Sequence, residues 1–354
     1  MRRTKKALAL LLAVIMSVAL VACGGDTEPA ATPEKEPTAT PEASVSTEKT
    51  SFDPSEMVIG YTQGSTSTEW EIAQASATKE PLEAAGYTVL YSDGQGKQEN
   101  QIAAIRSYIA QDVDAIIIYP VTTTGWDAVL EEIKEAEIPL IVFSRNIEPT
   151  EGKLTDYAIC YVGPDNVYAG EIITQACLDY FAEKEGPINV VVLEGVIGAS
   201  AAIERTEGIN NVITAQDKAK IIASQSANFT RTDGKEVMEA IIKKAEAEGT
   251  EIHAVIGEND DMSIGAIQAL TEAGYNCGTD VWIGGVDGVY SAFESMVAGT
   301  YNCTVENPLN YGEEIVKVFE NYFTDGSKPE EWVVLKNAIY FMDQAADLID
   351  TRTY

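Results

Sequence analysis

The sequence is poor in the side chains from which most catalytic and nucleic-acid sites are built. Its 354 residues contain 24 basic against 56 acidic side chains, a single histidine and five cysteines. The net charge of −32 repels nucleic acid and anionic lipid headgroups, so neither is expected as a partner. The lone histidine, His253, lies inside an apolar run far from any serine nucleophile motif, and we expect it to be structural.

Metal and cofactor motifs are also missing. The chain has no Walker A, HExxH or zinc-ligand spacing, and the glycine-rich stretch 284–288 lacks the spacing of a dinucleotide site. The acidic cluster at 258–261 is not an EF-hand loop. We therefore expect neither a metal ion nor a cofactor. Four scattered cysteines are expected to be free and buried, although their spacing leaves disulfides open: Cys160, Cys177, Cys277 and Cys303.

One long apolar run stands at the N-terminus. It follows four basic residues within positions 2–6, extends from Ala7 to Val21 with one serine, and ends in front of Cys23. This is the layout of a secretory signal peptide. A transmembrane anchor is the alternative, because a span needs roughly 17–25 residues. The run ends at small residues without an aromatic belt or a basic flank, which favours the signal peptide.

The four residues Leu20-Val21-Ala22-Cys23 resemble the lipobox of bacterial lipoproteins. In that family the cysteine becomes the first residue of the mature protein and carries lipid. The resemblance implies a signal peptide over residues 1–22, lipidation of Cys23, and anchoring at the outer face of the bacterial cell membrane. Residues 24–55 contain almost nothing apolar, so we expect residues 23–55 to be a lipidated cysteine followed by a disordered tether.

The rest of the chain alternates between two patterns. Short runs rich in valine and isoleucine predict strands at 57–62, 87–91, 115–119, 139–143, 157–162, 188–193, 220–225, 253–257 and 281–285. Longer amphipathic stretches predict helices, among them 98–110, 126–136, 168–183, 235–247 and 263–273. Such alternation indicates βαβ units and parallel strands buried on both faces. We predict an α/β protein with two doubly wound parallel-sheet lobes, because nine or more strands fit two lobes better than one sheet.

Polar side chains follow these strands, at the place where ligands bind in open α/β sheets. Amides, carboxylates, arginine and aromatic residues occur at 63–70, 93–95, 144–146, 194–195, 228–229, 258–261, 287–288 and 305–308. Planar amide, carboxylate and guanidinium groups can each bond two neighbouring hydroxyls, and aromatic rings cover the C–H face of a sugar. Each position alone is also an ordinary turn or helix-cap residue. Together they indicate a site for a polyhydroxylated ligand.

Four segments, 93–126, 198–209, 224–239 and 258–270, resemble the pentose/hexose type of periplasmic binding proteins, the sugar-capturing subunits of ABC importers. Within that family they are most similar to the galactofuranose-binding and ribose-binding branches. The resemblance implies a type I periplasmic-binding-protein fold with three hinge crossovers. The N-terminal lobe would comprise residues 56–163 plus 308–336, and the C-terminal lobe residues 164–307 plus 337–354.

The resemblance also implies ligand-binding residues in the N-terminal lobe. Trp70 matches the aromatic residue that stacks on the sugar ring, and Arg145 matches the arginine after the fourth strand. Gln95 and Asn146 are further candidates. From the residues alone, Trp70 could instead belong to the core. Arg145 follows an apolar strand and needs a partner, either a ligand or a structural carboxylate, because an unpaired buried charge is costly.

In the C-terminal lobe, Arg205 matches a second clamp arginine and Phe229 matches the aromatic residue of the far lobe. Asn259 and Asp287 match hydroxyl-binding groups, and Asn307 matches a polar residue near a hinge crossover. From the residues alone, Arg205 could lie on a helix surface and Phe229 could belong to the core. Asn259 and Asp287 could each be a helix cap.

Two positions depart from the family pattern. Ser144 stands where the family usually has aspartate, so one hydroxyl loses a charged partner. Glu71 stands where the galactofuranose branch has arginine, which inverts a charge that we expect at the mouth of the site. Both changes leave the sugar and its ring form open.

The function that these features predict is that of a monomeric, non-enzymatic solute-binding lipoprotein of an ABC-type sugar importer. It would bind a monosaccharide between the lobes and deliver it to permease and ATPase subunits. A sugar sensor that feeds a chemoreceptor or a membrane kinase is the alternative. A secreted glycosidase would need a pair of catalytic carboxylates, and the sequence isolates none.

Overall fold

The computed structural model describes residues 52–354, and the predicted signal peptide, Cys23 and nearly all of the predicted tether lie outside this range. At its start, Phe52 stacks on Phe323 with ring centroids 5.7 Å apart, and a 3-10 helix, η1 (Pro54–Glu56), follows. The predicted tether is therefore wrong for residues 52–55, because the ring of Phe52 has an aromatic surface to pack on. No helix within residues 52–354 has the length and apolarity needed to cross a bilayer.

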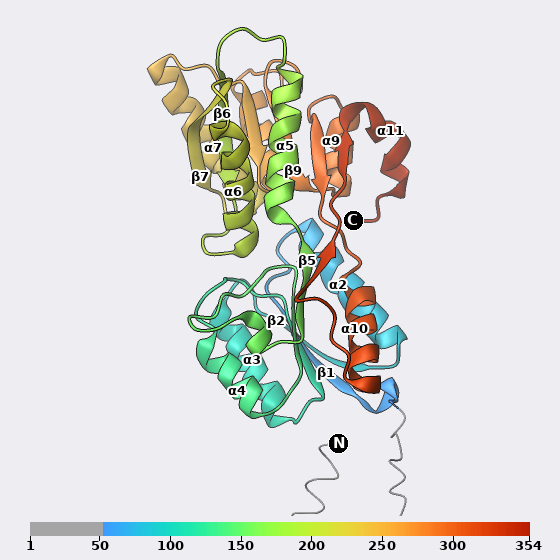
Figure 1. Ribbon diagram of the computed structural model, residues 1–354. Coiled ribbons are helices and arrows are strands. Elements are labelled where there is room, and N and C mark those ends of the chain that lie inside the picture. Colours follow the sequence, from blue (N-terminus) through green and yellow to red (C-terminus); the bar gives the residue numbers. More distant parts are fainter. Residues whose placement is uncertain (1–51) are drawn as a thin grey trace, which may run out of the picture. The chain divides into compact units, whose positions relative to one another are not determined.

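Two six-stranded sheets form the framework of the described residues (Figure 1). Sheet A has the strand order β11-β5-β4-β3-β1-β2, and sheet B has the matching order β12-β10-β9-β8-β6-β7. The strands of sheet A are β1 (Val58–Gln63), β2 (Thr88–Asp93), β3 (Ala115–Ile118), β4 (Leu140–Phe143), β5 (Cys160–Pro164) and β11 (Trp332–Leu335). Those of sheet B are β6 (Ile188–Glu194), β7 (Ala219–Ser226), β8 (Ala254–Gly257), β9 (Trp282–Asp287), β10 (Cys303–Glu306) and β12 (Ile339–Phe341).

Alternating side chains explain why the central strands of each sheet are buried on both faces. In β4, Ile141 and Phe143 join one buried cluster while Leu140 and Val142 join another on the opposite face of the sheet. The same alternation runs through β3, β6 and β8. Because successive side chains of a strand point to opposite faces, an unbroken apolar run fills two layers of core at once.

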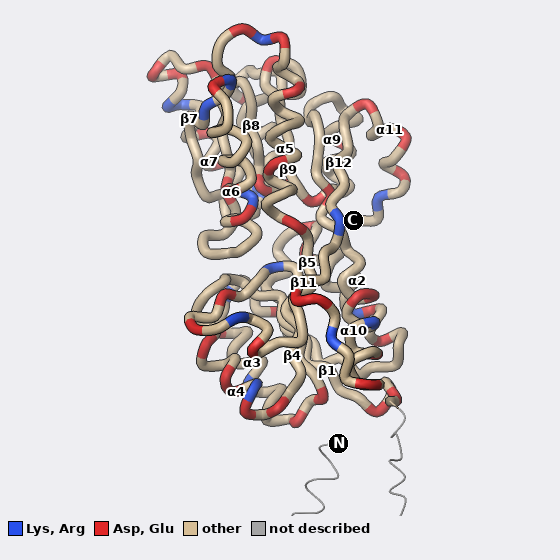
Figure 2. The backbone as a smooth tube through the Cα atoms, in the orientation of Figure 1, with Lys and Arg blue, Asp and Glu red and all other residues tan. Residues whose placement is uncertain are grey.

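Helices supply the outer layers. In the lobe of sheet A they are α2 (Glu69–Ala84), α3 (Gln98–Ala110), α4 (Asp127–Glu135) and α10 (Tyr311–Asp325). In the lobe of sheet B they are α5 (Asn166–Tyr180), α6 (Ser200–Thr214), α7 (Arg231–Glu248), α8 (Asp260–Glu272), α9 (Tyr290–Val297) and α11 (Ala345–Leu348). Short 3-10 helices complete the described chain: η2 (Leu154–Asp156), η3 (Met342–Gln344) and η4 (Ile349–Thr351). Acidic residues are distributed along both lobes (Figure 2).

The chain passes between the two lobes three times. Strand β5 leads into α5, which packs on sheet B; β10 leads into α10, which packs on α2; and β11 leads directly into β12. The predicted two-lobe α/β fold with three crossovers is confirmed. One detail differs, because β12 runs antiparallel to β10. The chain enters β12 from the crossover, where the parallel strands of sheet B end, so it must run in the opposite direction.

Helices α5 and α6 approach each other through glycine. A Cβ atom added at Gly208 would lie 2.0 Å from the carbonyl oxygen of Val167, and one at Gly170 would lie 2.3 Å from that of Arg205. Neither distance is possible for a real side chain, so only glycine permits this contact. The contact also sets the position of α6, the helix that carries Arg205.

Replacing Gly208 with alanine should lower the free energy of unfolding by about 1–3 kcal/mol, because the added methyl group forces α5 and α6 apart. Urea unfolding of the purified protein measures the loss. Asn210→Ala, at an exposed position of the same helix, is the control and should stay within about 0.5 kcal/mol of the parent. Equal stability of the two variants would contradict the close contact between the helices.

Candidate functional site

A small cavity lies where the carboxyl ends of the two sheets meet. It measures about 20 Å³ and is bounded by side chains that are at most 7% exposed. The lobe of sheet A contributes Thr68, Trp70, Glu71, Tyr119, Ser144 and Arg145. The lobe of sheet B contributes Asn166, Ala201, Arg205, Phe229, Asn259 and Asp287, and the second crossover contributes Asn307. Because all of these residues are buried, a ligand can reach them only when the lobes separate.

The structure brings together seven of the nine residues that the sequence predicts for ligand binding: Trp70, Arg145, Arg205, Phe229, Asn259, Asp287 and Asn307. The other two, Gln95 and Asn146, lie elsewhere. Gln95 lines an adjoining cavity of about 200 Å³, which shares Glu71, Arg145 and Phe229 with the first.

Local backbone geometry explains both exceptions. Gln95 sits in an exposed turn with a φ of 54°, and its backbone N–H donates to the Asp93 carboxylate. The side-chain oxygen of Asn146 accepts a hydrogen bond from the backbone N–H of Ile147, and Asn146 lines a separate groove of about 750 Å³. Its backbone N–H donates to the hydroxyl of Ser200 in the other lobe at 2.8 Å. Asn146 therefore joins the two lobes but lies outside the cavity.

Arg145 stands directly after β4. Ser144 has a φ of 64°, a left-handed conformation that turns the chain sharply at the end of the strand, and Tyr161 Oη donates to its carbonyl oxygen at 2.8 Å. The Arg145 guanidinium carbon lies 4.8 Å from the ring centroid of Tyr119 and 5.3 Å from that of Phe229. One ring belongs to each lobe, so the two lobes hold the guanidinium between them.

Glu71 is the carboxylate partner that Arg145 requires. Its Oε1 atom lies 3.5 Å from Nη2 of Arg145, and only 5% of the residue is exposed. Glu71 is in the first turn of α2, and its Oε2 atom accepts from the backbone N–H and the hydroxyl of Ser67, each at 3.1 Å. Glu71 is thus buried between the cavity and the exposed residue Ser67, and its place at the mouth of the site stays a prediction.

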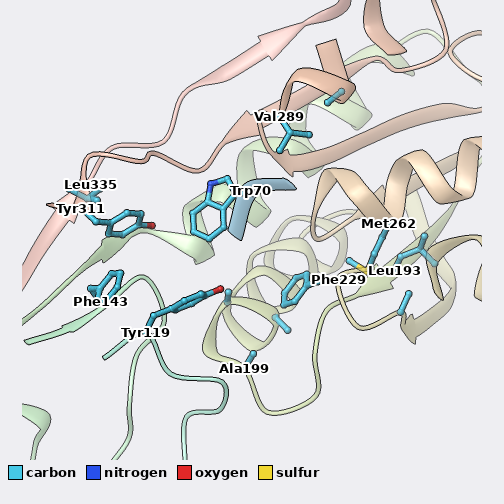
Figure 3. Packing of buried hydrophobic residues seen from close by; sticks show 14 of the residues in the cluster. Trp70, Tyr119, Phe143, Leu193, Ala199, Phe229, Met262, Val289, Tyr311 and Leu335 are labelled. Atoms are coloured by element: carbon cyan, nitrogen blue, oxygen red, sulfur yellow. The ribbon is translucent and has the colours of Figure 1, made fainter. Parts of the chain in front are cut away.

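Trp70 precedes Glu71 on α2 and faces an aromatic cluster. Its ring centroid is 6.4 Å from Tyr119 and 6.3 Å from Tyr311, both edge to face. Figure 3 shows Trp70, Tyr119 and Tyr311 close together, with Phe229 near the same space. The indole N–H donates to the carbonyl oxygen of Asn307 at 2.9 Å, so Trp70 ties α2 to the second crossover.

Arg205, on α6, is held much more firmly than Arg145. Its Nε donates to Oδ1 of Asn166 at 3.1 Å, and its Nη1 donates to the backbone carbonyl oxygen of Glu258. Asp287 Oδ1 lies 3.9 Å from the same Nη1. Burial raises the pKa of Asp287 well above its ordinary value, since it removes the water that would stabilise the carboxylate, and Arg205 opposes this shift.

Phe229 and Asn259 depend on one turn. Asn228 and Phe229 have φ values of 53° and 62°. Both adopt the left-handed conformation, which is unfavourable for residues other than glycine. The side-chain amide of Asn259 donates to the carbonyl oxygen of Phe229 at 2.9 Å, while its Oδ1 accepts from the backbone N–H of Met262 and caps α8. Asn259 thus combines the predicted place in the cavity with the helix-cap role that the residues also permitted.

Sequence reasoning missed several cavity residues. Tyr119 follows β3, Asn166 is the first residue of α5, and Thr68 is the N-cap of α2, and none of them has a distinctive spacing. The position of Tyr119 at the end of an apolar strand was the available signal. Within the described residues, no group of three or more histidine, cysteine, aspartate or glutamate side chains is placed to hold a metal ion. Cys160, Cys177, Cys277 and Cys303 are free, buried thiols.

Contacts between the lobes surround the cavity. On one side, Glu69 of α2 accepts from the hydroxyl of Ser291 at 2.7 Å and lies 3.8 Å from Arg231, both in the other lobe. On another side, the backbone N–H of Thr123 donates to the carbonyl oxygen of Gly198 at 2.8 Å. Opening the cavity requires that these contacts break, which is the behaviour of a hinge.

Comparisons with known proteins agree on one family. The chain matches the description "Periplasmic binding protein domain" over residues 59–328. It is 40% identical over 296 residues to the galactofuranose-binding protein YtfQ of Escherichia coli (strain K12), which covers 84% of this chain and 91% of that protein. Identity to the ribose import binding protein RbsB of Bacillus subtilis (strain 168) is 29% over 251 residues, 71% of this chain and 76% of that one.

A solved structure agrees as well. The periplasmic binding protein component of the arabinose ABC transporter from Shewanella sp. ANA-3, bound to α- and β-L-arabinofuranose, has a TM-score of 0.79 and 36% identity. The match covers 84% of this chain and 95% of that chain.

The buried carboxyl of Glu258 should give stability a distinctive pH dependence. Burial raises its pKa from an ordinary 4.5 to about 8 in the folded protein. Between these values the folded protein keeps a proton that the unfolded chain has lost, so this group makes the protein less stable as the pH rises. Glu258→Gln can still accept from Gly195 N–H and pair with the Thr206 hydroxyl, but it cannot titrate.

Melting temperatures measured from pH 5 to pH 8.5 test this prediction. The melting temperature of Glu258→Gln should fall less over this range than that of the parent protein, because one destabilising ionisation has been removed. Glu80→Gln makes the same chemical change at an exposed position and should follow the parent. Parallel profiles for all three proteins would show that Glu258 does not titrate with a raised pKa.

Proposed function

The chain belongs to the periplasmic binding protein family, and on that premise we propose that it is the extracytoplasmic solute-binding component of an ABC-type sugar importer. In this role it captures a monosaccharide between its lobes and delivers it to the permease, while ATPase subunits drive import. It acts by binding and release and performs no chemistry on the sugar.

The observation that carries the proposal is the composition of the buried cavity. It combines two arginines, two carboxylates, three asparagine amides and three aromatic rings in one closed space. Guanidinium, carboxylate and amide groups bond pairs of neighbouring hydroxyls, and aromatic rings cover the C–H surfaces of a sugar ring. These groups suit a small, polyhydroxylated molecule. The cavity of about 20 Å³ has room for about one water molecule, so a sugar would fit only between lobes that lie further apart.

Closure explains how such a site could capture and release its ligand. Arg145 and Trp70 come from the lobe of sheet A, whereas Arg205, Phe229, Asn259 and Asp287 come from the lobe of sheet B. A sugar that contacts both sets stabilises the closed form over the open form. The closed form then differs in surface from the open form, which gives a permease something to recognise.

We propose a galactofuranose-like sugar, or ribose or another pentose or hexose, as the ligand. Relatives named for galactofuranose and ribose support this class, as does the solved relative with bound arabinofuranose. We also propose that Cys23 is lipidated and that the residues between it and the folded lobes act as a tether, which would keep the binding protein beside its permease.

Replacing Arg145 with alanine should abolish sugar binding without unfolding the protein, because the cavity loses its principal adaptable hydrogen-bond donor. A thermal-shift screen of pentoses and hexoses identifies the ligand, since a bound sugar adds about 2.7 kcal/mol at a hundredfold excess over Kd. Calorimetry then compares the variant with the parent. Arg106→Ala is the matched control and should bind normally, because Arg106 is exposed and, within residues 52–354, its side chain pairs with Glu132 alone.

The two possible failures of this experiment have separate meanings. If no monosaccharide raises the melting temperature of the parent protein, the proposed sugar ligand is wrong. If a sugar binds the parent and Arg145→Ala with equal affinity, the proposal stands and the role of Arg145 is wrong.

Replacing Cys23 with serine should release the protein from the membrane, because serine cannot carry the thioether-linked lipid. Fractionation of cells that express the full chain measures the change, and sugar binding by the released protein should equal that of the parent. A variant that stays with the membrane fraction would count against the lipid anchor and favour an uncleaved membrane span.

A further inference from the structure

Glu71 occupies an unusual electrostatic position in the cavity. It is 5% exposed and faces Arg145. Glu71, Arg145 and Phe229 line both the inner cavity and the adjoining cavity of about 200 Å³. This carboxylate and this guanidinium therefore stand where the two cavities adjoin.

The two carboxylate oxygens of Glu71 are used very differently. Oε2 accepts two hydrogen bonds from Ser67, each at 3.1 Å. Oε1 has only long contacts, at 3.5 Å to Nη2 of Arg145 and 3.4 Å to Oη of Tyr119. Hydrogen bonds from charged groups are normally 2.7–2.9 Å long, so Oε1 retains acceptor capacity within the cavity.

Arg145 has matching donor capacity. Among the described residues, the only hydrogen bonds of its guanidinium are the 3.5 Å contact with Glu71 and a 3.4 Å contact from Nη1 to the carbonyl oxygen of Val121. A guanidinium has five N–H donors, and ring faces rather than acceptors hold this one in place. Arg205 differs, because close acceptors already occupy its Nε and Nη1.

We propose that Glu71 determines ligand specificity, accepting a hydrogen bond from a ligand hydroxyl through Oε1 and balancing the charge of Arg145 so that neutral sugars bind and sugar acids do not. This inference rests on the proposed sugar-binding function and specifies its substrate class. A carboxylate on the ligand would compete with Oε1 for the same guanidinium, and the two anions would repel each other in a buried space where water screens them little.

The test compares two variants on α2. Glu71→Gln keeps the shape of the side chain and removes its charge, and Glu80→Gln makes the same change at an exposed position of the helix. The probes are L-arabinose and D-galactose as neutral sugars and D-galacturonate as an anion, with binding measured by calorimetry. A third variant, Glu71→Asp, keeps the charge and is measured with the same probes. Melting curves without sugar verify that each variant is folded.

We expect Glu71→Gln to weaken binding of the neutral sugar by about tenfold or more, the worth of a hydrogen bond to a charged group. The affinity for D-galacturonate relative to D-galactose should rise by a similar factor, which a purely structural role would not produce. Glu71→Asp should still reject D-galacturonate. The control should match the parent with every probe.

Two results would overturn the inference, and each has its own meaning. If Glu71→Gln binds the neutral sugar as tightly as the parent and still rejects D-galacturonate, or if Glu71→Asp accepts D-galacturonate, Glu71 does not determine specificity. If no pentose or hexose of the thermal-shift screen binds the parent or the control, the failure lies with the proposed function, and the inference that rests on it falls too.

Discussion

The burial of two guanidinium groups between the sheets is the constraint on which the site depends. A buried ion loses several kcal/mol of hydration free energy, which only close partners can restore. Arg205 obtains its partners within its own lobe, from Asn166 and the backbone of Glu258. Arg145 does not, since its contacts with Glu71 and Val121 are long and one of its two ring contacts comes from the other lobe. The contacts that Arg145 makes when the lobes are closed therefore replace part of the hydration that its guanidinium loses on burial.

This difference separates the two arginines in function. Arg205 is a fixed part of its lobe, braced by the close packing of α5 and α6 at Gly170 and Gly208. Arg145 is adaptable, because aromatic rings attract a guanidinium without dictating where its N–H groups point. A ligand between the lobes can supply acceptors that the protein leaves out. Arg145 is therefore one of several groups whose contacts change when the lobes close, whereas the contacts of Arg205 lie mostly within its own lobe.

Much of the fold follows from patterns that the sequence displays directly. The helix predicted at 98–110 is α3 to the residue, and the apolar strands place Arg145, Phe229, Asn259 and Asp287 after strand ends, where parallel sheets expose their carboxyl edges. Such positions are predictable because they depend on strand order and direction alone. The antiparallel β12 was not predictable from residue patterns, since its direction depends on the side from which the chain enters the sheet.

The parts of the site that could not be predicted depend on side-chain direction. Gln95 and Asn146 stand at strand ends as Arg145 does, yet a turn and a bond to the next backbone N–H place them outside the cavity. Glu71 is buried beside Arg145 from its position in the first turn of α2, which no strand pattern signals. The residue types thus predict which edge of the sheets carries the candidate site. The hydrogen bonds that each polar group already makes within the protein determine which of its atoms remain available to a ligand. Oε1 of Glu71, the carboxylate of Asp287 and the N–H groups of Arg145 have only long contacts within the cavity, and these are the atoms that we propose for ligand recognition.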